Sequence, residues 1–161
     1  MGSKKTLSGL LLCLIFCFSS SGFCGDLEGP YSVTRVVDGD TIVISYNGTK
    51  EKVRMLCVDT PESVHPDKSR NSPQGKKASQ YTFHRLNGEN VYLEFEGRHR
   101  GKYGRLLAYV WIGDQNYNIE LVREGWSPYY IKYGRSGSYD PYFRAAESEA
   151  KRLHKNIWGD Q

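Results

Sequence analysis

The sequence predicts an α+β fold that is mainly β: a five-stranded barrel with a helix between strands three and four and two C-terminal helices. Three observations support this prediction. Five short segments rich in β-branched and aromatic residues are separated by turn residues such as Asp-Gly and Asn-Gly. One helical pattern follows the third segment, and two follow the fifth. The chain has no internal repeat and is of single-domain size.

Residues 1–24 have the pattern of a removable signal peptide. Lys4 and Lys5 form a positive start, and the apolar run 10–18 that follows is short for a bilayer span. Small and polar residues at 19–22 provide a cleavage region. The sequence therefore predicts export, with the mature protein secreted or periplasmic.

Two alternatives concern the same segment. A retained N-terminal anchor is disfavoured because the apolar run is short and no stop-transfer charges follow it. A lipoprotein modified at Cys24 is disfavoured because Phe23 stands where a small residue is preferred. We expect residues 25–161 to form one mature domain with no stable membrane span.

Net charge and cysteine content say little about function. The 22 Lys and Arg residues include Lys4 and Lys5, so 20 remain against 18 Asp and Glu, a mature net charge of +2. This is too small to attract nucleic acid by bulk charge, so any argument for a phosphate substrate depends on where the arginines lie. Cys24 and Cys57 give no disulfide framework, and Cys57 is expected to behave as a small buried apolar residue.

Strand signals come first in the mature chain. The segment 31–37 ends at Asp38-Gly39, and 41–46 ends at Asn47-Gly48; both dipeptides favour tight hairpin turns. A third strand is predicted over 50–58. Three strands joined by two tight turns form a meander.

A long polar loop and a helix follow. The segment 61–73 contains three prolines and no periodicity, and loops of this length are often functional. Ser72 and Pro73 are a typical N-cap and first helical residue, and the helix is predicted to end at Leu86, before Asn87-Gly88.

The C-terminal half completes the pattern. Strands are predicted over 90–95 and 105–112, joined by the basic, glycine-rich connection 97–104. Helices are predicted over 118–124 and 140–155. The expected buried side of the last helix is Ala145, Ala146, Ala150 and Leu153. This order of elements is that of an OB-type barrel with appended C-terminal helices.

Carboxylates gather at one end of the meander. The turn after the first strand lies at the end where the third strand exits, so Asp40, Asp59 and Glu62 are expected near one another. Carboxylates at one rim repel unless a cation lies between them, and oxygen ligands without His or Cys favour Ca²⁺, Mg²⁺ or Mn²⁺. The alternative is a set of solvated turn residues, because each motif alone is ordinary turn chemistry.

Two arginines add a phosphate-binding function to this prediction. Arg54 lies on the third strand, and the turn before Arg105 presents it at the start of the fifth. Guanidinium groups bind phosphate oxygens with two parallel hydrogen bonds, which strengthen as charge develops in a transition state. Either arginine alone would be better explained as a surface cation paired with a local acid.

Five segments together resemble the staphylococcal nuclease (thermonuclease) family. They are 37–41 (VDGDT), 54–62 (RMLCVDTPE), 102–109 (KYGRLLAY), 121–125 (LVREG) and 156–158 (NIW). Their order and spacings are similar to those of the family, and the resemblance covers essentially the whole mature chain.

The resemblance implies a calcium-dependent nuclease that cuts DNA and RNA and leaves 3′-phosphate ends. Asp40 and Asp59 match the family's calcium carboxylates, and the backbone carbonyl of Thr60 matches a further ligand. Glu62 matches the carboxylate proposed as general base for the attacking water. The protein is expected to be a monomer.

The resemblance also assigns substrate contacts. Arg54 and Arg105 match the two arginines that bind the scissile phosphate, and Lys102 and Tyr133 match residues that line the nucleotide site. The family has two tyrosines after its short second helix, and counting along this chain gives Ile131 and Tyr133.

This region leaves an alternative open. Base stacking by Tyr133 is the first expectation, with Tyr129 or Tyr130 as alternatives. The loop 63–72 also departs from the family in composition, so base preference does not follow from the resemblance.

Other functions remain as rivals. A non-catalytic OB module could bind nucleic acid or a protein partner, but intact acidic and arginine sets disfavour it. A second enzyme hypothesis keeps the carboxylates and uses two Mg²⁺ ions. A third uses His99 as the base of a metal-free nuclease, although the acidic cluster already provides a base.

Overall fold

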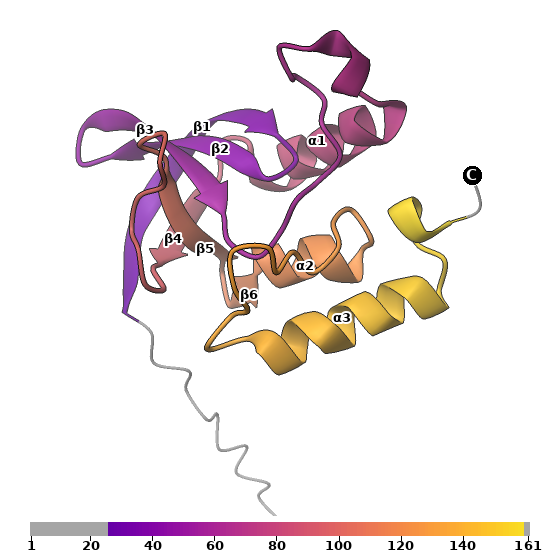
Figure 1. Ribbon diagram of the computed structural model, residues 1–161. Helices are drawn as coiled ribbons and strands as arrows, with labels where there is room; N and C mark the ends of the chain where they lie inside the picture. The colour runs from indigo at the N-terminus through magenta and orange to yellow at the C-terminus, as the bar shows by residue number, and fades with distance from the viewer. Residues whose placement is uncertain (1–25, 160–161) are drawn as a thin grey trace, which may run out of the picture.

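The structure is a computed structural model and describes residues 26–159 (Figure 1). The predicted signal peptide, 1–24, lies outside the described residues. Within 26–159, no helix is both long enough and apolar enough to cross a bilayer.

Five strands form a closed barrel, which confirms the predicted architecture (Figure 1). They are β1 Leu27–Asp38, β2 Thr41–Tyr46, β3 Thr49–Met55, β4 Asn90–Glu94 and β5 Leu106–Ile112. β2 and β4 pair antiparallel on either side of β1, β3 pairs with β2, and β5 with β4. A parallel pairing between β3 and β5 closes the barrel. This pairing brings the strand that carries Arg54 beside the strand that follows Arg105.

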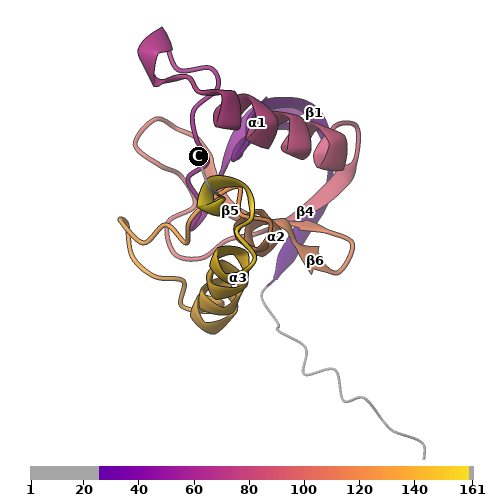
Figure 2. The same ribbon diagram turned by 90° about the vertical axis from the view of Figure 1, so that its right-hand side faces the viewer.

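Three helices lie outside the barrel, in the predicted order. They are α1 Pro73–Leu86, α2 Tyr117–Arg123 and α3 Asp140–Arg152. α1 packs on β1, and α2 packs between β5 and α3 (Figure 2). The predicted Ser72 cap is confirmed, because its Oγ accepts a hydrogen bond from the Gly75 N–H at 3.0 Å.

The core fills the barrel and extends beneath α2. Buried side chains of β2, β3, β4 and β5 meet those of the helices. Asn118 is the main polar group within this core: its Oδ1 accepts from the Val110 N–H at 2.9 Å. Its Nδ2 donates to the Leu56 carbonyl at 2.9 Å. These bonds join α2 to the end of the barrel where β3 exits, the region that carries the predicted site.

The third strand is shorter than the predicted 50–58. It ends at Met55, because Cys57 adopts a left-handed conformation with φ of 60° that a strand cannot contain. Val58 instead forms an isolated bridge with Tyr129. Cys57 is only half-buried, with its Sγ 3.8 Å from the Tyr109 hydroxyl, and burial raises the pKa of its thiol. The segment 55–58 thus leaves the sheet and contacts the loop after α2.

The buried side of the last helix also differs from the prediction. Ala146 and Ala150 are buried as expected, but Phe143 is the large residue of this face and was not predicted. The helical spacing 143, 146 and 150 places these three on one stripe. Ala145 lies off that stripe and is exposed. Leu153 is also exposed, because the helix ends at Arg152.

Three short elements were not predicted. They are the 3₁₀ turns Lys68–Arg70 (η1) and Asn156–Trp158 (η2) and the two-residue strand β6, Gln115–Asn116. Segments of two or three residues leave no periodic pattern in a sequence. η1 lies in the polar loop before α1.

Candidate active site

The turn between β1 and β2 is fixed by tight packing against Thr60. A Cβ on Gly39 would lie 2.6 Å from the Thr60 Oγ1, so glycine is required for this approach. On the other side, the Thr82 hydroxyl of α1 donates a 2.6 Å hydrogen bond to the Gly39 carbonyl. The turn that carries Asp40 is therefore held between the β3 exit and α1.

Asp40 is buried at this turn and bonded to the β3 exit. Its Oδ2 accepts hydrogen bonds from the Thr60 N–H at 3.0 Å and the Thr60 hydroxyl at 3.3 Å. The Met55 N–H donates to the Asp40 carbonyl at 3.0 Å. These contacts confirm that the first turn and the exit of the third strand meet at one rim of the barrel.

Arg54 lies between two carboxylates at that rim. Its Nη1 forms an ion pair with Asp40, and its Nη2 donates to the Asp59 Oδ1 at 2.6 Å. Burial lowers the pKa of the Arg54 guanidinium and nearby Arg105 acts in the same direction, while Asp59 and Glu62 oppose this. Charges of both signs therefore meet in one partly buried cluster.

The segment from Cys57 to Asp59 is tied to the C-terminal part of the chain. The Asp59 N–H donates to the buried Ser127 hydroxyl at 2.7 Å, and the Tyr130 N–H donates to the Cys57 carbonyl at 2.9 Å. Ser127 was not among the predicted site residues. No local sequence signal could have identified it, because it lies 68 positions from Asp59.

Asp38 is a second positioning residue that was not predicted. It is buried, and its Oδ1 accepts from the Gly39 N–H at 2.9 Å and the Ser63 hydroxyl at 2.7 Å. This links the β1–β2 turn to the residue directly after Glu62. The available signal was that the Asp-Gly-Asp motif contains another acid, Asp38, two residues before the predicted Asp40.

Glu62 is positioned through its backbone by the start of α1. The Ser72 N–H donates to the Glu62 carbonyl at 3.0 Å. Gly75 is buried against the same carbonyl, and a Cβ there would lie only 2.0 Å from its oxygen. The glycine permits a close approach between α1 and the segment that carries Glu62.

Gly75→Ala is therefore expected to displace Glu62 and to destabilise the fold by about 1–3 kcal/mol through overpacking. Thermal unfolding and cleavage rate together provide the measurement. Lys76→Ala, an exposed change in the same helix turn, serves as control. A Gly75→Ala protein with wild-type stability and rate would contradict the packing argument.

A clamp connects the loop before Arg105 to β3. Arg100 forms two 3.0 Å bonds to the carboxylate of Glu51 and donates to the Gly104 carbonyl at 2.7 Å. The hydrogen bonds from Arg100 lower the pKa of Glu51. The Gly101 N–H donates to the Arg105 carbonyl at 2.9 Å. The backbone on both sides of Arg105 is thus fixed relative to the strand of Arg54.

Four of the predicted site residues line one pocket of about 260 Å³. They are Asp40, Arg54, Glu62 and Arg105. Asp59 and Thr60 adjoin it through their bonds to Arg54 and Asp40. The remaining lining residues are Val37, Asp38, Thr41, Lys52 and Val64. The pocket combines acids with arginines, the chemistry that the sequence predicted for this rim.

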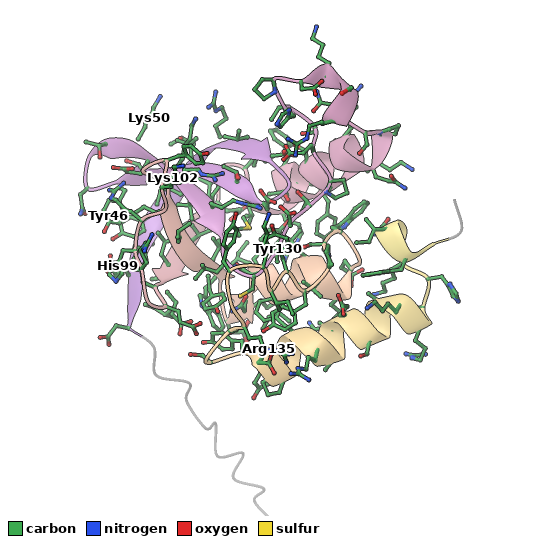
Figure 3. All side chains as sticks on the ribbon, viewed as in Figure 1. Tyr46, Lys50, His99, Lys102, Tyr130 and Arg135 are labelled. Carbon is green, nitrogen blue, oxygen red and sulfur yellow. The ribbon has the colours of Figure 1, made fainter. Side chains whose placement is uncertain are left out.

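The predicted nucleotide contacts lie outside this pocket. Lys102 is exposed on the connection between β4 and β5, with its amine 5.9 Å from the Tyr103 ring centre (Figure 3). Tyr133 is 87% exposed, and its ring meets Tyr130 edge-on at 6.0 Å. Their roles remain predictions. Figure 3 shows Tyr130 on the loop after α2.

Of the two alternative stacking residues, Tyr129 uses its side chain in contacts within the fold. Its ring stacks on Phe143 at 4.9 Å, and its hydroxyl donates to Asp140 at 2.9 Å. Burial raises the pKa of Tyr129 to about 12. Tyr130 and Tyr133 therefore have rings better placed for a base.

Within residues 26–159, no three His, Cys, Asp or Glu side chains form a group that could hold a metal ion. Asp40, Asp59 and Glu62 share one rim but do not converge as three ligands of one ion in the described residues. The physical reason is the arrangement of charge: the Arg54 guanidinium lies between Asp40 and Asp59 and neutralises them. A metal at this rim would use two carboxylates supplemented by backbone or water oxygens.

His99 does not reach the acidic cluster. It is exposed at the β4–β5 connection, and its ring stacks on Phe95 at 4.4 Å (Figure 3). It does not line the pocket that contains Glu62 and Arg105. The hypothesis of a His99 base therefore has no geometric support.

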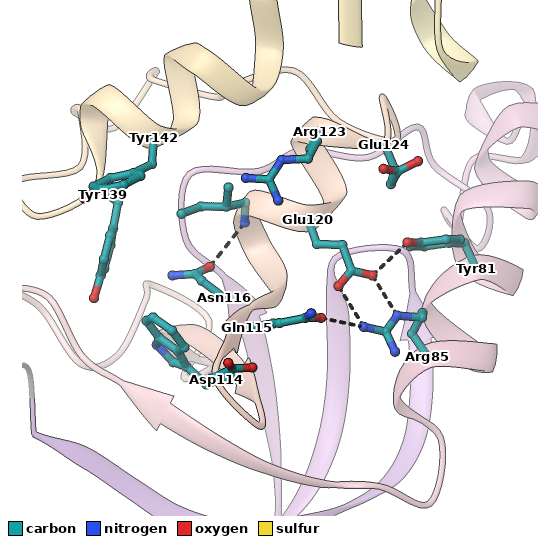
Figure 4. A pocket seen from close by; sticks show the side chains of 12 residues that line it. Tyr81, Arg85, Asp114, Gln115, Asn116, Glu120, Arg123, Glu124, Tyr139 and Tyr142 are labelled. Carbon is teal, nitrogen blue, oxygen red and sulfur yellow. Dashed lines mark hydrogen bonds and ion pairs between the residues drawn. The ribbon is translucent and has the colours of Figure 1, made fainter. Parts of the chain in front are cut away.

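A larger pocket of about 550 Å³ lies against α2 (Figure 4). Its polar wall is a network in which Arg85 binds Glu120 at 2.7 Å and 2.8 Å, and the Tyr81 hydroxyl donates to Glu120. None of the predicted site residues lines it. Among the described residues that line this pocket, Arg85 is paired with Glu120 and Arg123 with Glu149, so neither arginine is left unpaired for a phosphate.

Known proteins provide an independent comparison. Residues 52–160 match the model of the family described as staphylococcal nuclease homologues. A thermonuclease of Staphylococcus hyicus is 39% identical, over 89% of this chain and 83% of its own. A thermonuclease of Staphylococcus intermedius is 42% identical, over 83% and 79%.

A further relative is the endonuclease YncB of Bacillus subtilis (strain 168), which is 41% identical over 79% of this chain and 60% of its own. The family match begins within β3, two residues before Arg54, and covers the acidic segment 57–62 and α1 to α3. This chain belongs to the staphylococcal nuclease family and is a nuclease, a hydrolase of phosphodiester bonds.

Proposed function

We propose that this protein is an exported, Ca²⁺-dependent nuclease that hydrolyses DNA and RNA and leaves 3′-phosphate ends. The observation that carries the proposal is the pocket in which Arg54 and Arg105 lie with Asp40 and Glu62. The kind of end produced and the range of substrates rest on the family resemblance. Export rests on the signal-peptide pattern of residues 1–24.

The donor chemistry at the rim fits calcium. Asp40 and Asp59 direct carboxylate oxygens at a single cationic group, and the Thr60 backbone adjoins them. Ca²⁺ accepts such mixed carboxylate, carbonyl and water ligands, whereas Mg²⁺ requires a stricter octahedral shell. Asp40, Asp59 and the Thr60 carbonyl would hold the ion. When bound, it supplies a Lewis acid for the phosphate and orients water.

The arginines would bind the scissile phosphate. Arg54 has its donors directed at two carboxylates in this structure. Neutralisation of those carboxylates by a metal would leave the guanidinium free to bond phosphate oxygens. Arg105 shares the pocket and has no ion pair within the described part of the chain. Two guanidinium groups would then face the charge that develops on phosphorus.

Glu62 would accept the proton of the attacking water. It lines the pocket beside Arg105, and its backbone is fixed by Ser72 and Gly75. Within residues 26–159, no hydrogen bond or ion pair engages the Glu62 side chain, so its carboxylate is open to a water molecule in the pocket. Water then loses its proton to Glu62 as its oxygen bonds to phosphorus and the P–O bond to the 5′ oxygen breaks.

Metal removal tests the proposal. Labelled single-stranded DNA, duplex DNA and RNA are incubated with the mature protein in Ca²⁺, in Mg²⁺ or in chelator, and the product ends are identified. We expect cleavage of all three in Ca²⁺, weak turnover in Mg²⁺ and none in chelator. Undiminished cleavage after exhaustive chelation would refute the metal requirement.

The same preparation separates the rival hypotheses. Equilibrium dialysis counts the bound ions, and two Mg²⁺ per chain with better activity in Mg²⁺ would favour the two-metal enzyme. Binding of every substrate without turnover in any metal would favour the non-catalytic module.

A further inference from the structure

A third cation, Lys52, lines the candidate active-site pocket and has no role in the mechanism above. It lies on β3, two residues before Arg54. Successive side chains of a strand alternate between its faces, so Lys52 and Arg54 project from the same face. Its backbone pairs with Val43 of β2, which fixes its position on the barrel.

Lys52 lacks the carboxylate partners that two other cations on or beside β3 have. Arg54 is paired with Asp40 and Asp59, and Arg100 is paired with Glu51. Within residues 26–159, no hydrogen bond or ion pair engages the Lys52 amine, and its side chain is exposed. An unpaired ammonium at the edge of a pocket is available for an anion in solution.

The spacing along β3 indicates which anion. Two residues of a strand span roughly 7 Å, so Lys52 and Arg54 leave the barrel at separate points. Consecutive phosphates of an extended nucleic-acid strand are separated by a similar length. If Arg54 and Arg105 hold the scissile phosphate, the adjacent phosphate falls within reach of the flexible Lys52 side chain.

We propose that Lys52 forms a binding subsite for the phosphate next to the scissile one, so that the enzyme prefers polynucleotides to substrates with one phosphodiester. This inference rests on the proposed function. A lysine suits the task, because a mobile point charge can follow a flexible backbone without the fixed geometry that a guanidinium fork imposes. Such a contact is formed in the ground state and retained in the transition state, so it acts mainly on substrate affinity.

The test compares Lys52→Gln with Lys50→Gln. Lys50 lies on the same strand and face but outside the pocket, and Figure 3 shows it near the β2–β3 hairpin. Each protein is assayed on a labelled single-stranded oligonucleotide and on a nucleoside aryl phosphodiester with a single phosphate. Oligonucleotide affinity is also measured in chelator by fluorescence anisotropy over a range of salt concentrations.

For Lys52→Gln, we expect the preference for the oligonucleotide, as the ratio of the two kcat/KM values, to fall about fivefold. The affinity should fall by a similar factor, and the salt slope should become shallower by about 0.7, the value for one lost contact with a single strand. Lys50→Gln should show a much smaller change in each quantity.

Three outcomes would overturn the inference. An equal loss on both substrates would place Lys52 at the scissile phosphate. The same changes in Lys50→Gln would indicate an effect of general surface charge. The third outcome is no change in preference, affinity or salt slope. If wild type cleaves neither substrate, the proposed function fails, and the anisotropy comparison alone decides whether Lys52 binds a phosphate.

Discussion

Replacing Glu62 with glutamine is expected to lower kcat by about 10²–10⁴-fold, the range for the loss of a general base. The change keeps the size and the hydrogen-bonding shape of the side chain but removes the group that accepts the water proton. The backbone of residue 62 should stay in place, because the Ser72 N–H and Gly75 bind and pack against its carbonyl rather than its side chain.

Calcium binding separates a lost base from a damaged site. Isothermal titration of Ca²⁺ should give Glu62→Gln an affinity close to that of wild type, because Asp40 and Asp59 are intact. Asp67→Asn, an exposed change in the same loop, is the matched control. A Glu62→Gln enzyme with an unchanged kcat would exclude the base role, and loss of Ca²⁺ affinity would reassign Glu62 as a ligand.

Replacing Arg54 or Arg105 with lysine is expected to lower kcat by about 10²–10³-fold with little change in KM. Each substitution keeps the positive charge, so ground-state attraction to the substrate is largely retained. A lysine cannot form the planar pair of hydrogen bonds to two phosphate oxygens, and these bonds are needed most as charge builds on phosphorus.

Steady-state cleavage of a short labelled oligonucleotide provides the measurement, after circular dichroism has shown that each variant is folded. Arg98→Lys, an exposed position on the β4–β5 connection outside the pocket, is the control. If folded Arg54→Lys and Arg105→Lys enzymes cleave as fast as wild type, the proposal that both arginines bind the scissile phosphate is wrong. A rise in KM alone would assign the arginines to substrate binding.

Much of the fold could be predicted because its signals are local. Asn47 and Gly48 both have positive φ, as the tight turn predicted from Asn-Gly requires, and α1 has its predicted bounds of Pro73–Leu86. The meeting of Asp40 with the β3 exit followed from the meander alone. These features depend on alternation, caps and turn chemistry within a few residues.

The missing features depend on contacts between distant parts of the chain. The bond from Asp59 to Ser127 and the clamp between Glu51 and Arg100 join residues 68 and 49 positions apart. The early end of β3 follows from the turn at Cys57, where the chain leaves the sheet to meet Tyr129. A single sequence records the residue types in such pairs but not that they meet.

The hydrogen bond between Asp59 and Ser127 makes the timing of chain synthesis matter for the active site. All of the candidate catalytic residues, from Asp40 to Arg105, are complete before residue 127 is added to the growing chain. Until then, the Asp59 N–H lacks its partner, and the segment 57–59 lacks the strand-like bridge at Tyr129. A nascent or prematurely terminated chain can therefore contain every candidate catalytic residue without the two contacts that fix the segment 57–59. The contacts that position Asp59 at the candidate site therefore form only late in the synthesis of the chain.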